Sequence, residues 1–228
     1  MIDSDGNGID GTVEFLNGGC GVTGSVNFTN IEKVICFTPG TLIATLTGER
    51  KLESLREGDK VVTRDNGIQE VRWIGRRQLT GQDLARAQHL RPVRIRAGAL
   101  GGGLPERDMV LSPNHRVLVS NDKTALYFDD REVLVASKHL TGLDGVDEIE
   151  VNMVTYIHFM FDQHEVVLSD GSWTESFQPG DISLDGLVNA QRTEIFELFP
   201  ELKTAEGMKD YPAARRSLKK HEARALFL

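Results

Sequence analysis

A cysteine and a distant histidine are the residues of this chain with the most specific chemistry. Cys36 directly follows Ile35, and far downstream lies a short polar segment, Ser112–His115. A thiol on the residue after a peptide bond can attack the carbonyl before it and convert the amide into a thioester. Pro113 suits the second position of a type I turn, which would bring both ends of the segment to one side. If the fold joins these groups, their target is the chain's own Ile35–Cys36 bond.

Each of these residues has a definable role in such a reaction. The shift to a thioester is uphill in an ordinary peptide, so the fold must twist the bond, hold its carbonyl and protonate the departing nitrogen. We expect Ser112 to donate to the carbonyl of Ile35 and His115 to protonate the amine of Cys36. An imidazole titrates near neutral pH, as this donor role requires. The alternative is a plain turn with a capping serine and a surface histidine.

Composition limits the class of protein. The 228 residues carry a formal net charge of -8, with 39% hydrophobic and 26% charged residues. This balance is typical of a globular chain that is long enough to bury a sizeable core. An acidic chain disfavours binding to nucleic acid or to an anionic membrane, because both depend on clustered lysine and arginine. No apolar run is long enough to span a bilayer.

The first residues and the two cysteines limit where in or outside the cell the protein is expected. The start of the chain is acidic and has no apolar segment behind it, so no cleavable secretory signal is expected. We therefore expect a cytoplasmic protein, an extracellular one exported without such a signal, or a fragment of a longer protein. Cys20 and Cys36 make no disulfide framework, but they could form one bridge in an oxidising compartment. That bridge would remove Cys36 as a nucleophile.

Short strands dominate the pattern from Thr41 onward. β-Branched runs alternate with Gly, Asn and Pro turns, and Asn66-Gly67 is a strong hairpin signal. Together these features predict a mainly β fold, interrupted by short helices at 51–55 and 81–90. The expected strands are 13–16, 26–28, 41–46, 60–63, 69–74, 93–95, 109–111, 116–119, 132–135, 149–161 and 165–168.

The composition divides the chain into three parts. Residues 1–35 are rich in Gly, Asp, Asn and Thr, which predicts a weakly folding segment of short strands and turns. Residues 36–178 hold the main β domain. Helical spacing of apolar residues at 189–199 and 212–228 predicts that residues 179–228 form a helical extension packed on that domain.

Three segments together resemble the Hint superfamily, which groups the autoprocessing domain of hedgehog proteins with inteins and bacterial intein-like domains. They are Cys36–Thr41, Leu52–Val61 and Ser112–Arg116. The resemblance covers roughly residues 36–178, and the long form here is similar to the bacterial Hint-type domains often found beside secreted repeat proteins. It implies a flat, horseshoe-like all-β fold with the two ends of the domain close together. It also implies that Cys36 is the nucleophile, with His115 and Ser112 matching the histidine and the usual threonine of the second motif.

Two departures from the family pattern shape the expected reaction. The last family motif, an aromatic-Asp-aliphatic strand, is similar to Tyr156–Phe159, where His158 holds the acidic position. Either His158 serves as the base for the thiol or Asp162 takes the acidic role. Splicing inteins end in His-Asn followed by Cys, Ser or Thr, whereas Asp170–Trp173 occupies that region here. The resemblance therefore implies cleavage at Ile35–Cys36 without full splicing.

The leading hypothesis is a single-turnover, self-cleaving domain rather than a turnover enzyme. Its substrate would be its own N-terminal segment, and water or another nucleophile would open the thioester. The alternative is a non-catalytic secreted β module that binds calcium or protein partners.

A calcium pattern near the start of the chain supports that alternative weakly. Asp3, Asp5 and Asn7, with Glu14 at the twelfth position, fit the EF-hand loop. No helix can precede Asp3, so a polar turn is favoured over weak Ca²⁺ binding. No zinc site has convincing spacing, and no cofactor is expected.

Overall fold

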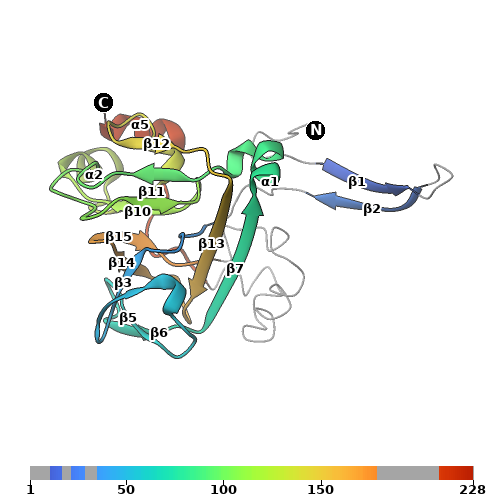
Figure 1. The fold of residues 1–228 in the computed structure, drawn as a ribbon. Coiled ribbons are helices and arrows are strands. Elements are labelled where there is room, and N and C mark those ends of the chain that lie inside the picture. Colours follow the sequence, from blue (N-terminus) through green and yellow to red (C-terminus); the bar gives the residue numbers. More distant parts are fainter. Residues whose placement is uncertain (1–10, 17–21, 29–34, 179–210, 228) are drawn as a thin grey trace.

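Strands form most of the regular structure in the computed structural model, which describes residues 11–16, 22–28, 35–178 and 211–227 (Figure 1). The helices of this described part are short, and none is long and apolar enough to cross a membrane. The mainly β fold expected from the sequence is confirmed, as is a helix near the C-terminus.

The largest sheet has eight strands in the order β11-β10-β15-β14-β3-β5-β6, with β4 attached to β3. Its neighbours pair antiparallel, and Asn66-Gly67 lies in the tight connection between β5 and β6, as expected. Gly67 has a φ of 66°, which an L side chain rarely adopts. The strands are β3 (Leu42–Thr45), β4 (Gly48–Lys51), β5 (Lys60–Val62), β6 (Ile68–Glu70), β10 (Arg116–Val119), β11 (Val133–Ala136), β14 (Val166–Ser169) and β15 (Ser172–Glu175).

A long two-stranded ribbon runs beside this sheet (Figure 1). Its strands, β7 and β13, pair antiparallel along their whole length, and His158 lies opposite Gly75. Strands β12, β8 and β9 form a smaller antiparallel sheet. The bounds are β7 (Trp73–Thr80), β8 (Val93–Ile95), β9 (Met109–Leu111), β12 (Val146–Glu148) and β13 (Met153–Met160).

The described N-terminal residues form a separate antiparallel hairpin. Strand β1 (Gly11–Leu16) pairs with β2 (Val22–Phe28), where the sequence predicts two shorter strands. The rest of the expected N-terminal segment, including Asp3, Asp5, Asn7 and Cys20, lies outside the described residues.

Helices are confined to the connections and to the C-terminal end. The helix expected at 81–90 is divided at Ala87 into two, and the first begins with a capping box between Thr80 and Asp83. A similar box between Asn121 and Thr124 begins a helix that the sequence analysis missed. The helical elements are η1 (Leu52–Ser54), α1 (Gly81–Arg86), η2 (Gln88–Leu90), α2 (Asp122–Phe128), η3 (Ser137–His139) and α5 (Lys220–Phe227).

The C-terminal segment corrects one expectation. The helix predicted from residue 212 begins only at Lys220, because residues 216–218 pair with the edge of β11 instead. Leu218 N–H donates to the carbonyl of Leu134 at 2.9 Å, and Leu134 N–H donates to the carbonyl of Arg216 at 2.8 Å. Helix α5 then buries Ala223 and Leu226 in the main core. The helix expected at 189–199 lies outside the described residues.

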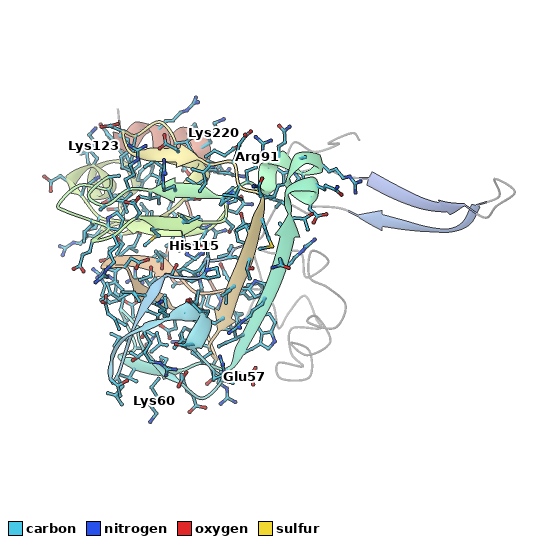
Figure 2. The ribbon with its side chains drawn as sticks, viewed as in Figure 1. Glu57, Lys60, Arg91, His115, Lys123 and Lys220 are labelled. Carbon is cyan, nitrogen blue, oxygen red and sulfur yellow. The ribbon has the colours of Figure 1, made fainter. Side chains whose placement is uncertain are left out.

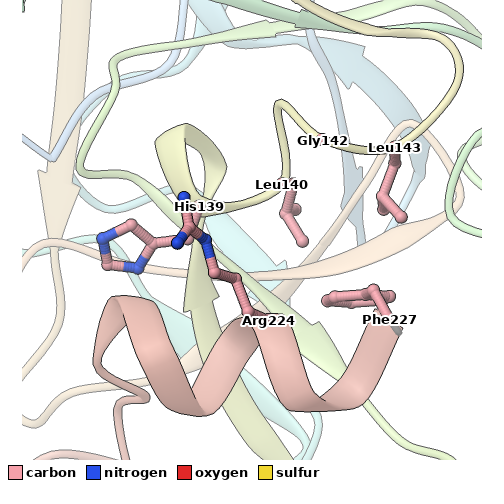
Figure 3. A pocket seen from close by; sticks show the side chains of 6 residues that line it. All are labelled: His139, Leu140, Gly142, Leu143, Arg224 and Phe227. Carbon is pink, nitrogen blue, oxygen red and sulfur yellow. The ribbon is translucent and has the colours of Figure 1, made fainter.

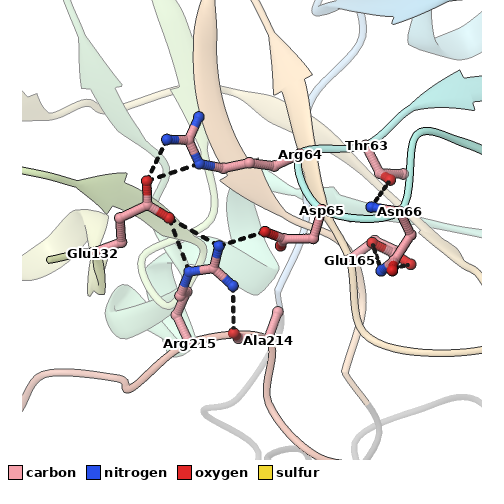
Figure 4. A network of polar contacts seen from close by, with 8 residues as sticks. All are labelled: Thr63, Arg64, Asp65, Asn66, Glu132, Glu165, Ala214 and Arg215. Carbon is pink, nitrogen blue, oxygen red and sulfur yellow. Dashed lines mark hydrogen bonds and ion pairs between the residues drawn. The ribbon is translucent and has the colours of Figure 1, made fainter. Parts of the chain in front are cut away.

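Charged side chains join this segment to the sheet (Figure 4). The Arg215 guanidinium lies 2.8 Å from the Glu132 carboxylate and 2.6 Å from that of Asp65. Arg64 also binds Glu132, so one carboxylate connects two guanidinium groups. Partly exposed ion pairs add little stability singly, and a network chiefly fixes geometry. The extended segment therefore has one defined position on the sheet.

Candidate functional site

Backbone pairing holds Cys36 at the junction of two sheets. Phe37 N–H donates to the carbonyl of Ile157 at 2.8 Å, and Ile157 N–H donates back at 2.9 Å. On the other side, Phe37 also forms a bridge with Leu111 of β9. The Phe37 ring stacks on Phe159 with 5.5 Å between ring centroids, so the residue after Cys36 is fixed by both backbone and side chain.

The thiol of Cys36 lies against an imidazole in the interior. Its Sγ is 3.1 Å from Nδ1 of His158, and both residues are buried. Burial raises the pKa of the Cys36 thiol well above its ordinary value, and nearby Arg77 opposes this only in part. Burial, aided by Arg77, lowers the pKa of His158 to about 3. At neutral pH the pair is therefore a neutral thiol beside a neutral imidazole that can accept its proton.

Ser112 forms hydrogen bonds with both backbone polar groups of Cys36. Its hydroxyl oxygen accepts a hydrogen bond from the Cys36 N–H at 2.8 Å, and its own N–H donates to the Cys36 carbonyl at 2.9 Å. The hydroxyl thus lies at the nitrogen of the Ile35–Cys36 bond, whereas the sequence analysis placed it at the carbonyl of Ile35. This geometry suits a group that exchanges a proton with the departing amine.

The expected turn at Ser112–His115 is present, and the side chain of Ser137 bonds to its backbone. His115 N–H donates to the carbonyl of Ser112 at 3.0 Å, which closes the turn. The Ser137 hydroxyl contacts the carbonyls of Ser112 and Pro113 at 2.9 and 3.1 Å. Ser137, at the start of η3, therefore holds the turn in place next to Cys36.

His115 is buried, so the alternative of a surface histidine does not hold (Figure 2). Its ring packs edge-on against Phe37, with 4.2 Å between centroids. Neither ring nitrogen has a hydrogen-bond partner among the described residues. Burial lowers the pKa of His115 to about 3, and the charges of Arg116 and His164 lower it further. The ring is therefore neutral at neutral pH, and the Cys36 N–H donates to Ser112 and not to this ring.

Asp162 does not join this group. Its side chain is 75% exposed and lies 3.3 Å from Arg72 at the surface. Cys36 is completely buried. Of the two candidates for the acidic position of the family motif, only His158 contacts the thiol.

A buried polar cluster that the sequence analysis did not identify borders His115. Arg116 donates to the Glu175 carboxylate at 3.0 Å, and His164 Nε2 lies 3.4 Å from the same carboxylate. Nδ1 of His164 accepts a hydrogen bond from Ala214 N–H at 3.0 Å, so Nε2 carries the proton of the neutral ring. The cluster thus connects the turn to the C-terminal segment. No local sequence pattern marks these residues, because they meet only through strand pairing.

The surroundings of Cys36 are apolar. The thiol packs in a cluster with residues of β7, α1, η2 and β13, namely Leu79, Leu84, Leu90, Val154 and Tyr156. Cys36 is a free thiol, and Cys20, the other half of the bridge considered above, lies outside the described residues. The described residues contain no group of three or more His, Cys, Asp or Glu side chains able to hold a metal ion.

A cavity of about 320 Å³ lies elsewhere, between α5 and the segment after η3 (Figure 3). Its lining is mostly apolar, and His139 and Arg224 stand at one side. Burial lowers the pKa of His139 to about 4, and Lys138, Lys220 and Arg116 add to the effect. The described lining includes none of Cys36, His115 and His158, so the cavity is not the thiol site. The cavity is lined by His139, Leu140, Gly142, Leu143, Arg224 and Phe227.

Comparison with known proteins gives one family. The family model described as the Hint domain matches residues 35–181. A bacterial intein-like domain from Clostridium thermocellum aligns with 63% of this chain and 99% of its own, at 16% identity and a TM-score of 0.42. An AceL NrdHF class 3 split intein covers 62% of this chain and 98% of its own, at 11% identity and a TM-score of 0.43. No curated protein sequence matches the chain.

Proposed function

This chain belongs to the Hint domain family, and on that premise we propose that it cleaves its own Ile35–Cys36 bond through a thioester, without splicing. Domains of this kind process the chains that contain them, so the N-terminal segment is the natural substrate. The observation that carries the proposal is the placement of two groups on Cys36. Its sulfur lies 3.1 Å from His158 Nδ1, and its amide nitrogen lies 2.8 Å from the Ser112 hydroxyl.

The first step exchanges a C–N bond for a C–S bond. The Cys36 thiol gives its proton to Nδ1 of His158 while the sulfur attacks the carbonyl carbon of Ile35. As the C–N bond breaks, the Ser112 hydroxyl gives its proton to the departing nitrogen, and the Ser112 oxygen regains a proton from the imidazolium of His158. The products are a thioester at Ile35 and a free amine on Cys36, with no net proton consumed.

Burial favours this route over a free thiolate. The raised pKa of Cys36 means that the thiol is almost entirely protonated at neutral pH. A base must therefore remove the proton during attack rather than before it. The neutral imidazole of His158 is placed to do so, whereas the exposed Asp162 is not.

His115 is assigned the second proton-transfer role, beside the amine of Cys36. Its ring borders Phe37, and neither nitrogen is engaged by another described residue. The proposed role is to exchange a proton with that amine once the bond to Ile35 breaks. A neutral imidazole can accept a proton at one nitrogen and release one from the other.

The second step opens the thioester. Water, or another nucleophile, attacks the Ile35 carbonyl carbon and releases the Cys36 thiol. With water, the N-terminal segment leaves with a new carboxylate. Splicing is not proposed, because Asp170–Trp173 lies in the hairpin of β14 and β15 and contains no His-Asn pair.

The proposal is tested on the full chain. Incubation with dithiothreitol or hydroxylamine should give two fragments whose masses place the cut between Ile35 and Cys36. The Cys36→Ala variant should stay intact, while Cys20→Ala, the matched change at the other cysteine, should be cleaved normally. An uncut wild-type chain under all these conditions would contradict self-processing and favour the second candidate, a non-catalytic β module. The complete burial of the thiol is the observation that keeps this second candidate open.

A further inference from the structure

Gly75 is a glycine in the interior of a strand, where glycine weakens the pairing and needs a packing reason. Its backbone is not among those with positive φ, so conformational freedom does not explain it. In the β7–β13 ribbon it lies directly opposite His158. A Cβ atom added at Gly75 would overlap Nε2 of His158 and Cη2 of Trp73. The imidazole therefore occupies the space that a side chain at position 75 would need.

Aromatic rings complete the enclosure of this imidazole. The indole of Trp73 stacks on the His158 ring, with 5.0 Å between centroids and 23° between planes. Phe177 also lies 5.0 Å from it, at a tilt of 58°. Phe177 is itself tied to β13, because its N–H donates to the carbonyl of Phe159 at 3.0 Å. The ring of His158 thus has little freedom to turn, and Nδ1 is directed at the sulfur of Cys36.

We propose that Gly75 is a positioning residue of the self-cleavage site. The bare backbone at this position lets the His158 ring lie against β7, and Trp73 and Phe177 hold it there. A single methyl group at position 75 displaces the ring and removes Nδ1 from the sulfur. The inference rests on the proposed function only for its effect on cleavage, since the position of the ring can be measured separately.

The ring position is measured in a Cys36→Ala background, in which the precursor stays intact. NMR should show contacts between the His158 ring protons and the methyl group at position 36. Adding Gly75→Ala should remove these contacts. Adding Gly142→Ala, at a glycine with open space and no positive φ, should leave them unchanged. Contacts of unchanged intensity in the Gly75→Ala chain would overturn the proposal.

Cleavage is measured with Cys36 in place. Gly75→Ala should slow it about 100-fold or more, the usual contribution of a positioned base. In a His158→Ala chain, adding Gly75→Ala should not slow cleavage further, because the imidazole ring that the added methyl group would displace is already absent. An additional loss in the double variant would show that Gly75 acts by another route. If the wild-type chain does not cleave at all, the proposed function fails, and the NMR contacts still decide the role of Gly75.

If Gly75→Ala folds poorly, its stability can be used to test the same proposal. Removal of the ring in Gly75→Ala with His158→Ala leaves room for the added methyl group and for Trp73 to shift. The double variant should therefore fold and melt at a higher temperature than Gly75→Ala alone. If the double variant is as unstable as the single one, the glycine serves the backbone and not the imidazole, and the proposal is wrong.

Discussion

The sulfur of Cys36 lies 3.1 Å from Nδ1 of His158, although 122 residues separate them in the chain. The contact follows from strand pairing, because Phe37 exchanges two backbone hydrogen bonds with Ile157. Those bonds bring the residue before Phe37 beside the residue after Ile157. The contact between the thiol and the imidazole thus follows from the pairing of strand β13 with the residues around Cys36.

Replacing His158 tests its assignment as the base. His158→Gln should slow cleavage about 100-fold or more, because an amide cannot accept the thiol proton. The measurement is the rate of fragment release in dithiothreitol, followed by mass. His139→Gln, at the half-buried histidine of the separate cavity, should cleave at the wild-type rate. Equal rates in both variants would remove His158 from the mechanism.

Replacing Ser112 tests the group at the departing nitrogen. Ser112→Ala leaves the buried Cys36 N–H without its acceptor, which should cost about 1–3 kcal/mol of stability and also slow cleavage. Ser169→Ala is the matched control, since Ser169 is equally buried and bonds to Thr174. It should lose stability without a specific loss of cleavage rate. If the two variants cleave alike once both are folded, Ser112 has only a structural role.

The buried histidines predict a loss of stability in acid. His115 and His158 have folded pKa values of about 3, below the ordinary value of 6.5, so only the unfolded chain binds their protons between these limits. Stability is therefore fully present above pH 6.5 and is lost as the pH falls toward about 3. Each histidine contributes about 1.4 kcal/mol per pH unit across that window.

Urea unfolding at a series of pH values measures this slope. His115→Phe keeps an aromatic ring against Phe37 and removes one titrating group. Its stability should depend less steeply on pH than that of the wild-type chain, by about one proton. Parallel curves for the two proteins would mean that His115 is protonated in the folded state.

The C-terminal helix should contribute to stability. Leu226 is 3% exposed and belongs to the main core, so Leu226→Ala should cost about 2–3 kcal/mol in urea or thermal unfolding. Leu126→Ala, in the helix α2, is the control, because that side chain is 76% exposed. It should change stability by about 0.5 kcal/mol or less. Similar losses in both variants would contradict the packing of α5 on the core.

Local signals predicted much of the fold and part of the site. The turn at Ser112–His115 follows from its proline and asparagine, and the strands at 93–95, 109–111 and 116–119 have the bounds expected from short apolar runs. Asn66-Gly67 marks its hairpin for the same reason: a backbone conformation that few residues tolerate. These features depend on neighbours in the sequence, which a pattern can detect.

Features that depend on distant residues could not be predicted in this way. The pattern of residues 212–219 suits a helix, yet Arg216 and Leu218 form backbone hydrogen bonds with Leu134 and pair with the edge of β11 instead. The placement of the Ser112 hydroxyl at the nitrogen of Cys36 depends on how the turn docks, which its own sequence does not specify. The burial of Glu175 with Arg116 and His164 likewise requires strands β10 and β15 and the connection between β13 and β14 to assemble.

The segment at 211–219, just before α5, has a consequence for the order of assembly during synthesis. It completes the edge beside Leu134 and supplies the Ala214 N–H to His164. While a ribosome still covers these residues, strand β11 lacks its neighbour and the ring of His164 lacks its donor.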